Sequence, residues 1–504
     1  MDVIQGLAQG FATALTPINI LYVLLGCIAG TLIGALPGIG PPAGVAILIP
    51  LSFGMDPTTA MILMAGLYYG AMYGGTITSV LVNVPGESSS VMTTLDGYQM
   101  ALKGRAGPAL GMAAIASFIA GTFSVAMLML LAPPIANAAL AFGPPEYVGL
   151  LVLGLMMLTT LVGRSQLRGL LSALFGLMLA VVGLDAISGG ARYTYGTLEL
   201  LDGIDFLPVA VGLFGVAEVL VSIERTIVLK PMAAPLRSLI PTGDDWRFSL
   251  PPIARGSVIG FLIGVLPGAG ATVATFIAYG VEKRFARRRA QLGTGVIEGV
   301  ASPEAANNAS TGGALIPLLT LGLPGSGTTA VMLGALIMLG VTPGPLLFQQ
   351  RPDFVWSVIA SMYIGNVALL ILNIAFVPAF VWALRMPYSI LGPVILVLCI
   401  VGVYSINYST FDIWIMFAMG LIGYGMRKLD FPAAPAVLAL VLGQQLETSL
   451  RQSLLISRGS LEVFFTRPIA LTLLVIALAV LVVPPILRRI RPDIQRELIV
   501  GEEV

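Results

Sequence analysis

The sequence contains no histidine, and this absence excludes several kinds of site at once. Haem ligation, most zinc sites and Ser-His-Asp catalysis all depend on an imidazole ring. Cysteine is nearly absent too, because Cys27 and Cys399 are the only two and each lies inside an apolar run. We interpret both as small buried hydrophobic residues and expect no disulfide, no cofactor and no enzyme of these classes.

Charged residues are also scarce. They make up 10% of the 504 residues, whereas soluble domains carry about 25%. Hydrophobic residues make up 57%, and a membrane-spanning helix needs roughly 20 of them in a row. The composition therefore predicts an all-α polytopic membrane protein with about 11 to 12 transmembrane segments. The net charge of +1 gives no reason to expect nucleic acid as a partner.

No Lys or Arg occurs among the first 100 residues. A secretory signal begins with a basic region, so we expect no cleaved leader at this end.

Two sequence motifs occur twice, in the same order. The first is GALPGIG at 34–40, which returns as GVLPGAG at 264–270. The second is YGGT at 73–76 followed by NVPGESSS at 83–90, which is echoed by TGGA at 311–314 and GLPGSGTT at 322–329. Internal repeats of this kind are typical of transporters and indicate duplication.

The four Pro-Gly elements interrupt apolar runs. The Leu-Pro-Gly elements lie between arms that are partly too short to span a bilayer, so we interpret them as re-entrant hairpins over 18–54 and 253–281. The later elements split 73–102 and 312–341 into what we interpret as pairs of half-helices, each pair about as long as one crossing. Irregular backbone at membrane depth persists only inside protein or beside a polar cavity, so the breaks indicate a binding site. The alternative is that Pro and Gly merely kink packed helices.

Basic residues predict how the repeats are oriented. Lys103 and Arg105 follow the first discontinuous helix, whereas the basic run at 283–289 follows the second hairpin. Because basic loops prefer the cytoplasm, this shift predicts an inverted repeat. The predicted domains are a first transmembrane repeat (1–228), a cytoplasmic linker (229–252) and a second transmembrane repeat with a C-terminal helix (253–504). Within 430–467, the predicted topology does not place the basic residues Arg451, Arg458 and Arg467 on the cytoplasmic side of the membrane, where basic residues are expected.

The tips of the broken helices are the predicted substrate site. Half-helix N-termini present unpaired N–H groups and the positive end of the helix dipole, which suits an anion. No Lys or Arg lies in these tips, and such a site releases a carboxylate more readily than a bidentate arginine does. Ordinary bonding of the hydroxyls to helix carbonyls is the alternative. The candidate substrate-binding residues are Gly38, Gly40, Ser88, Ser89, Ser90, Gly268, Gly270, Thr272, Ser326, Thr328 and Thr329.

Polar residues near the breaks are candidates for cation coupling, because acidic groups at membrane depth are expensive and usually functional. A carboxylate there could hold sodium or carry a proton, and asparagine oxygens are further sodium ligands. The alternative is that these are helix-end or surface groups. The candidate coupling residues are Glu87, Asn83, Glu304, Asn307 and Asn308, and Asp96 is a further carboxylate on the run after the first break.

The same motifs carry a resemblance to a known family. Gly34 to Pro42, Tyr69 to Ser90, Thr94 to Gln99 and Glu304 to Thr328 resemble the large transmembrane subunit of the tripartite tricarboxylate transporters. The resemblance implies a secondary active symporter in the bacterial inner membrane, driven by sodium or protons. It also implies a periplasmic substrate-binding protein and a small four-helix membrane subunit as partners. The implied substrates are tricarboxylates such as citrate, or related small carboxylates.

Two other classes of function stay open. An intramembrane enzyme needs an acid and a base within hydrogen-bond reach of each other, whereas the breaks offer mainly hydroxyls and glycines. A channel would show a pore-lining ring instead of two sets of broken helices.

The orientation is testable by labelling single cysteines in a background without Cys27 and Cys399. We expect positions 103 and 287 to be protected in intact spheroplasts, and positions 56 and 351 to be labelled by an impermeant thiol reagent. Labelling of position 103 or 287 from outside would contradict the inverted repeat.

Overall fold

The computed structural model describes residues 3–36, 39–161, 165–185, 188–224, 239–383 and 388–490. Of these described residues 81% are helical, which confirms the all-α class. In these ranges the only strands are β1 (Gly183–Leu184) and β2 (Ala191–Arg192), an antiparallel pair with Gly183 opposite Arg192. The sequence had given no sign of this small hairpin.

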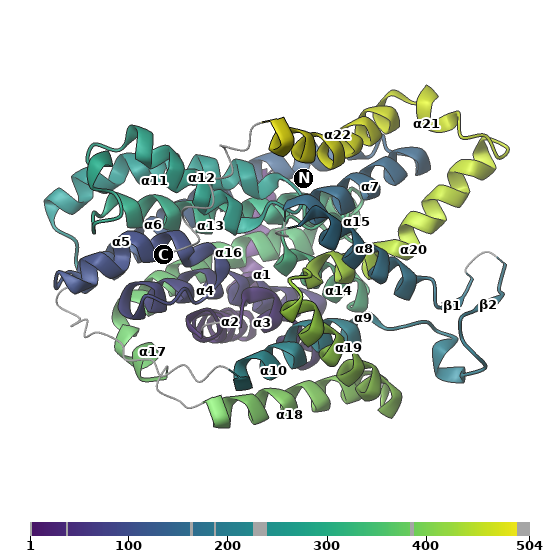
Figure 1. The fold of residues 1–504 in the computed structure, drawn as a ribbon, viewed down its shortest axis with the longest axis horizontal. Helices are drawn as coiled ribbons and strands as arrows, with labels where there is room; N and C mark the ends of the chain where they lie inside the picture. Colours follow the sequence, from purple (N-terminus) through teal and green to yellow (C-terminus); the bar gives the residue numbers. More distant parts are fainter. Residues whose placement is uncertain are drawn as a thin grey trace. The chain divides into compact units, whose positions relative to one another are not determined.

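The chain forms two compact units (Figure 1). Unit 1 comprises Met1–Leu140 and Ile204–Leu429, and unit 2 comprises Ala141–Gly203 and Asp430–Val504. Each unit takes segments from both predicted repeats, so the division into 1–228, 229–252 and 253–504 stays a prediction.

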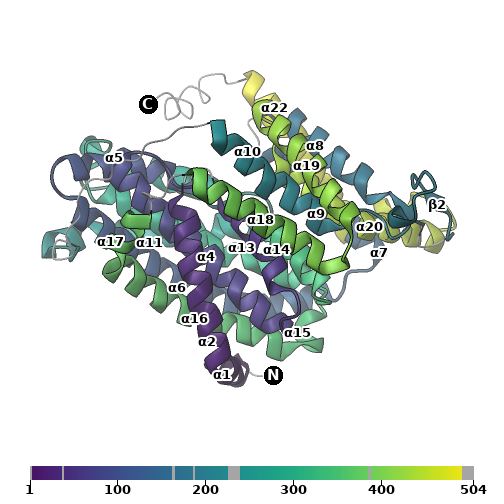
Figure 2. The same cartoon turned by 90° about the horizontal axis from the view of Figure 1, so that it is seen from below.

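Unit 1 contains most of the helices. Its first segment holds α1 (Val3–Ala14), α2 (Pro17–Ala35), α3 (Pro41–Leu48), η1 (Pro50–Ser52), α4 (Pro57–Val82), η2 (Ser88–Ser90), α5 (Val91–Leu102) and α6 (Ala106–Ala139). Its second segment begins with α9 (Phe206–Ala210), the π-helix η4 (Val211–Val216), α10 (Ala217–Glu224), α11 (Gly243–Val265), α12 (Gly270–Phe285), η6 (Arg289–Gln291) and α13 (Glu298–Leu321). It continues with α14 (Gly327–Met338), α15 (Leu347–Gln350), α16 (Pro352–Ala375), α17 (Val377–Ala383), α18 (Tyr388–Asn407) and α19 (Thr410–Lys428). Figure 2 shows α1 beside α16, where Gly6 lies against the Trp356 ring.

Unit 2 contains the remaining elements, which are α7 (Pro144–Leu161), α8 (Gln166–Ala180), β1, β2, η3 (Leu198–Leu200), α20 (Ala433–Ile456), α21 (Val463–Thr466) and α22 (Pro468–Ile490). Within it, α20 packs on α7 and α8, and α22 packs on α7.

Five described helical stretches are long and apolar enough to cross a membrane: α2, α6, Phe206–Glu224, α11 and α16. Helices α4, α13, α18, α19 and α20 each have 19 or more residues as well. The chain is thus an all-α polytopic membrane protein, and the total of about 11 to 12 spans stays a prediction.

The apolar arms of the predicted hairpins over 18–54 and 253–281 are the helices α2, α3, α11 and α12, but two differences stand out. Helix α1 precedes the first predicted run. Helix α11 begins at Gly243, inside the predicted linker 229–252, because Thr242 and Asp245 form a capping box there that starts the helix before the apolar run. The part of the linker at 225–238 lies outside the described residues.

Glycines bring two helix pairs into close contact in the same way. A Cβ atom added to Gly26, Gly30 or Gly34 of α2 would lie 2.3, 2.2 or 2.0 Å from the carbonyl oxygens of Leu63, Leu67 and Ala71 in α4. A Cβ atom added to Gly256, Gly260 or Gly264 of α11 would lie 2.4, 2.2 or 2.4 Å from those of Ser302, Ala306 and Ser310 in α13. Small residues four apart allow this approach in membrane helices. The α2–α4 and α11–α13 pairs therefore repeat one packing arrangement, which agrees with a duplication, while its inversion across the membrane stays a prediction.

These contacts also correct the alignment of the second motif. Gly256 lies 230 residues after Gly26, and Ser302 lies 239 residues after Leu63. On the same spacing, Gly74 against the Thr31 carbonyl corresponds to Gly313 against the Phe261 carbonyl. The pairing of 73–76 with 311–314 is thus wrong by one residue, because the two glycine pairs occupy different positions along the shared helix face.

The breaks do not divide a single crossing into halves. Helix α4 has 26 residues and α13 has 24, so each is long enough to span a bilayer before its break. Only α5 and α14, with 12 residues each, are short. The prediction of half-helix pairs was wrong because the Gly-Gly pairs lie inside continuous α-helix, where Gly74 and Gly313 face neighbouring helices.

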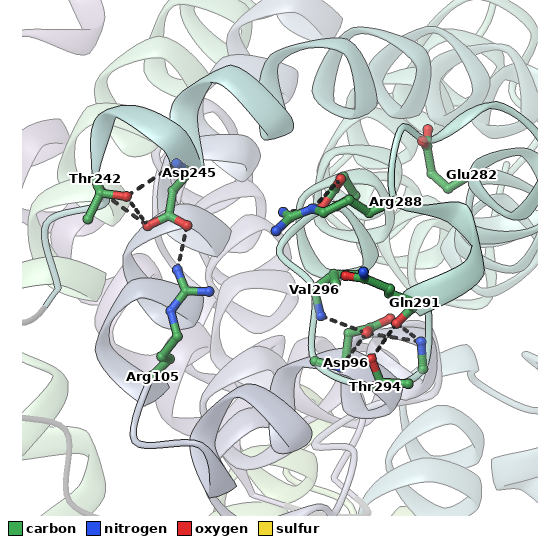
Figure 3. Close-up of polar contacts among 12 residues, drawn as sticks. Asp96, Arg105, Thr242, Asp245, Glu282, Arg288, Gln291, Thr294 and Val296 are labelled. Atoms are coloured by element: carbon green, nitrogen blue, oxygen red, sulfur yellow. Dashed lines mark hydrogen bonds and ion pairs between the residues drawn. The ribbon is translucent and has the colours of Figure 1, made fainter.

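The two basic loops of unit 1 lie together. The Lys103 ammonium donates a hydrogen bond to the Thr294 carbonyl, beyond the basic run at 283–289. Nearby, Arg105 pairs with Asp245 at 2.5 Å (Figure 3). Both loops therefore reach the same end of unit 1, while the inversion of the repeats stays a prediction.

In unit 2, acidic partners account for two arginines that fell on the unexpected side. Arg451 pairs with Asp185 at 2.9 Å and with Glu447 at 2.6 Å, and Arg467 lies 3.6 Å from Glu146. Arg192 of β2 binds Glu447 at 2.8 Å in the same network. All three arginines therefore serve local ion pairs, which sequence position alone could not reveal. Arg192 and Arg451 also line a cavity of about 410 Å³.

The shared glycine packing predicts equal sensitivity at equivalent positions. Gly30→Ala and Gly260→Ala should each destabilise the protein by about 1 to 3 kcal/mol, because the new methyl group overpacks a backbone contact. Gly280→Ala is the control, since nothing lies within 4 Å of a Cβ atom there. Membrane abundance and thermal unfolding in detergent measure the effect. Variants as stable as the control would contradict the packing.

Candidate functional site

The first break folds back along α4. After Val82 the chain turns so that Gly86 lies against Gly75 and the Gly34 carbonyl, and Ser89 reaches Met72. The second break does the same, because Gly325 lies against Ala314 and the Gly264 carbonyl. These three positions correspond in the two halves. Each break therefore carries the start of a short helix back into the interior.

The 3-10 helix η2, which leads directly into α5, and the short helix α14 begin with equivalent caps. Glu87 accepts a hydrogen bond from the Ser89 N–H, and Ser90 completes a capping box. At the corresponding place in the second half, Ser326 and Thr329 form a capping box on α14. The difference is electrostatic: the cap of the first half is a carboxylate, and the cap of the second half is a neutral hydroxyl.

Glu87 belongs to a buried network that joins both repeats. The Ser89 hydroxyl donates to Glu87 and lies 2.7 Å from Asn307 Oδ1. Asn307 Nδ2 lies 3.3 Å from the Met72 carbonyl and 3.5 Å from Glu87 Oε1. Glu87, Ser89 and Asn307 are all at most 7% exposed. The predicted coupling residues Glu87 and Asn307 are thus brought together, with Ser89 between them.

Glu304 is the centre of a second buried network, one turn from Asn307 on α13. Its carboxylate accepts hydrogen bonds from Thr76 at 2.7 Å, Thr93 at 2.5 Å and Ser117 at 3.4 Å. Asn308 donates to the Ser117 hydroxyl at 2.7 Å, while its Oδ1 is buried without a partner among the described residues. Helices α4, α5, α6 and α13 each supply one or more of these groups. The structure thus brings Glu304 and Asn308 together as well.

A small cavity adjoins Glu304. It measures about 10 Å³ and is lined by Tyr73, Thr76, Ser117 and Asn373 along with apolar residues. This volume is close to the minimum for one water molecule. A dehydrated ion or a single water is therefore the largest occupant in this conformation.

The predicted tips also meet one another. The Ser88 and Thr272 hydroxyls lie 2.8 Å apart, and Ser88 is exposed. The Gly270 N–H donates to the Gly325 carbonyl at 3.2 Å, and Ser326 lies 3.1 Å from the Tyr68 hydroxyl. The tips of η2, α12 and α14 therefore converge from both halves.

The networks around Glu87 and Glu304 contain two buried carboxylates and no basic side chain among their described members. An uncompensated buried charge is very costly, so hydroxyl bonds alone are a weak substitute for a counter-charge. Each carboxylate is therefore suited to hold a proton or a cation.

Several predicted residues take other places. Asn83 is exposed and ends α4 in the left-handed conformation with φ of 60°, so we interpret it as a helix cap. Gly40 caps α3, Gly268 supplies a turn with φ of +81°, and Thr328 is 3% exposed on α14. Gly38 lies outside the described residues.

Sequence reasoning missed Thr93, Ser117 and Tyr68 as members of the site. Ser117 is a single hydroxyl within a long apolar run, and Thr93 precedes the quoted motif at 94–99. Helical spacing does relate Ser89 to Thr93 and Glu304 to Asn308, each four residues apart on one face. That spacing could have found Thr93, but only packing identifies the partners of Ser117 and Tyr68.

Comparison with known protein families matches residues 20–438 to the tripartite tricarboxylate transporter TctA family. The chain belongs to this family. The match covers α2 to the start of α20 and includes both networks, which confirms the resemblance carried by the motifs. Membership supports a role as a transporter subunit and favours transport over catalysis.

Two relatives come from Agrobacterium vitis. An uncharacterised 52.8 kDa protein in the TAR-I ttuC′ 3′ region is 45% identical over 483 residues, which is 96% of each chain. An uncharacterised protein in the TAR-II ttuC′ 3′ region is 45% identical over 215 residues, or 43% of this chain and 89% of that protein. No solved structure matches the chain.

Proposed function

We propose that this TctA-family protein is a cation-coupled symporter that imports a small carboxylate. Tricarboxylates such as citrate are the proposed substrates, together with related small carboxylates. Sodium or a proton is the proposed coupling ion. The proposal includes a periplasmic substrate-binding protein and a small four-helix membrane subunit as partners, and the bacterial inner membrane as the location.

The observation that carries the proposal is the position of Glu87. It caps the short helix whose tip, Ser88 to Ser90, is a proposed anion site. A charged Glu87 would repel a carboxylate arriving at that tip. Substrate can therefore bind well there only after a proton or a cation has neutralised Glu87. This requirement couples binding of the cation or proton to binding of the carboxylate. The coupling does not depend on a large conformational change.

The other tips suit the anion. Helix α14 has 12 residues and begins with the neutral cap Ser326, so its positive dipole end is free of a competing carboxylate. Gly270 and Thr272 on α12 lie beside Ser326 and Ser88 respectively. Because several tips meet, a substrate with two or three carboxylates can contact more than one of them.

The coupling ion is proposed to bind where the carboxylates are. Glu87 and Asn307 offer carboxylate and amide oxygens, and Glu304 is surrounded by the Thr76, Thr93 and Ser117 hydroxyls. Such oxygen donors suit sodium, and either carboxylate can instead carry a proton. The buried position of both carboxylates supports coupling to transport, because a surface role would not require burial.

Coupling is tested with Glu87→Gln and Glu304→Gln in membrane vesicles. Neutral glutamine removes the need for a cation, so gradient-driven accumulation should fall at least about tenfold while substrate exchange persists. Glu199→Gln, at an exposed glutamate of unit 2, is the control. Normal accumulation by both variants would place the coupling site elsewhere.

Thr93→Val and Thr94→Val make a matched pair in the same assay. Thr93 donates to Glu304, whereas Thr94 bonds the backbone carbonyl of Val91. Loss of a bond to a charged group is worth about 1.5 to 3 kcal/mol, so Thr93→Val should change the half-saturating cation concentration about ten- to a hundredfold. Thr94→Val should change it little.

The substrate site is tested with Ser89→Val, Thr328→Val and Gly40→Leu. Each adds apolar surface at a tip, so apparent substrate affinity should fall roughly ten- to a hundredfold with membrane abundance maintained. Gly270 is a poorer probe because its φ of +63° disfavours any side chain. Thr466→Val, at an exposed threonine of unit 2, is the control. Abundant variants with unchanged affinity would mean that the breaks are only packing kinks.

A further inference from the structure

Asp96 lies on α5, two turns beyond the proposed site, and is fully buried. Its carboxylate accepts hydrogen bonds from the N–H groups of Gly293 at 2.9 Å, Gly295 at 2.8 Å and Val296 at 2.9 Å. The Tyr279 hydroxyl adds a fourth donor at 2.9 Å. Figure 3 shows Asp96 beside the loop that carries Thr294 and Val296. Both carboxylate oxygens thus accept hydrogen bonds from donors of the protein itself.

The loop around Asp96 is built for an anion. Gly293 and Gly295 have φ of +90° and +98°, a conformation that favours glycine and turns successive N–H groups toward one point. Gly295 also passes within 3.0 Å of the α5 backbone, measured from an added Cβ atom. The anion that this loop binds is the protein's own Asp96 carboxylate. The loop therefore joins two parts of the chain and is not a vacant anion site.

Asp96 and Ser88 hold the same two helices together. Ser88, just before α5, contacts Thr272 of α12, and Asp96 of α5 contacts Tyr279 of α12. The intervals are eight and seven residues, or about 12 and 10 Å of helix. Helices α5 and α12 therefore run side by side in the same direction and are joined by two side-chain contacts. One contact is in the proposed site, and the other is made by Asp96.

The Asp96 carboxylate also contacts the start of α13. A Cβ atom added to Gly299 would lie 1.9 Å from Asp96 Oδ2, so the absence of a side chain at Gly299 makes room for the carboxylate. Glu304 and Asn307 follow on the same helix within about two turns. Asp96 thus fixes the first break against both α12 and α13 of the second repeat.

We propose that Asp96 is a positioning residue: it holds the tip at Ser88 to Ser90 in register with Thr272 and with the α13 carboxylate network. The role rests on the proposed transport function, which it deepens. It assigns Asp96 no ion, because its oxygens already accept five hydrogen bonds from four donors. The carboxylate acts on transport through α5.

The first test measures geometry and needs no transport. In a background with Cys27→Ala and Cys399→Ala, the pair Ser88→Cys and Thr272→Cys should form a disulfide readily under mild oxidation. Asp96→Asn should slow this cross-linking about tenfold or more, because its amide cannot accept three N–H bonds as a carboxylate does. Tyr279→Phe removes one donor only and should give a smaller slowing. If Asp96→Asn does not insert into the membrane, the cross-linking rate of Tyr279→Phe is the measurement that tests the proposal.

The second test uses Gly299→Ala as an independent way to displace Asp96. Alone, it should slow the cross-link and raise the apparent substrate KM, with less effect on the maximal rate per inserted molecule. Combined with Asp96→Ala it should add little, because the new methyl group then has space. Gly280→Ala is the control, since an added Cβ atom there meets nothing within 4 Å.

The outcomes separate the two proposals. Slower cross-linking with non-additive Gly299→Ala and Asp96→Ala effects supports the positioning role, even if no carboxylate uptake is found. Unchanged cross-linking, additive effects, or a fall in abundance with unchanged cross-linking and kinetics per molecule would overturn it.

Discussion

The structure depends on keeping two carboxylates inside a membrane protein without a basic side chain among the described members of their networks. Glu87 and Glu304 are each at most 7% exposed and are surrounded by hydroxyl and amide groups. Such groups stabilise a charge only partly, so each carboxylate is suited to hold a proton or a bound cation. The proposed coupling role of this cluster of polar side chains rests on that constraint.

The duplicated helix packing explains how the site is assembled. Glycines four residues apart bring α2 onto α4 and α11 onto α13, and each break then folds back along the second helix of its pair. The tips of η2, α12 and α14 consequently meet, and the networks around Glu87 and Glu304 each contain residues from both repeats. The repeats are similar in backbone but not in charge, because Glu87 stands where the second repeat has Ser326. In the proposed function, this asymmetry lets one tip respond to a cation while another binds an anion.

The sequence predicted the helical class, the order of nearly all helices and the polar residues at the breaks, because apolar runs and Pro-Gly elements are local signals. It also grouped Glu87, Asn83, Glu304, Asn307 and Asn308 as coupling candidates, and all of these except Asn83 join the two buried networks. It could not predict that α4 and α13 are continuous, since their glycines serve helix packing instead of ending helices. Nor could it identify Ser117 or the partners of Asp96, because their roles come from residues 183 to 200 positions away. Arg451 disagreed with the predicted topology because the sequence does not reveal its acidic partners.

The most direct measurement of the central claim is uptake of labelled citrate and other di- and tricarboxylates into vesicles that contain this protein, with its partner components supplied. We predict accumulation above the external concentration only with an inward sodium or proton gradient, and loss of accumulation when an ionophore collapses that gradient. Equilibration without accumulation would indicate a channel, and chemical conversion of the substrate would indicate an enzyme. Either result, or accumulation independent of any cation gradient, would contradict the account.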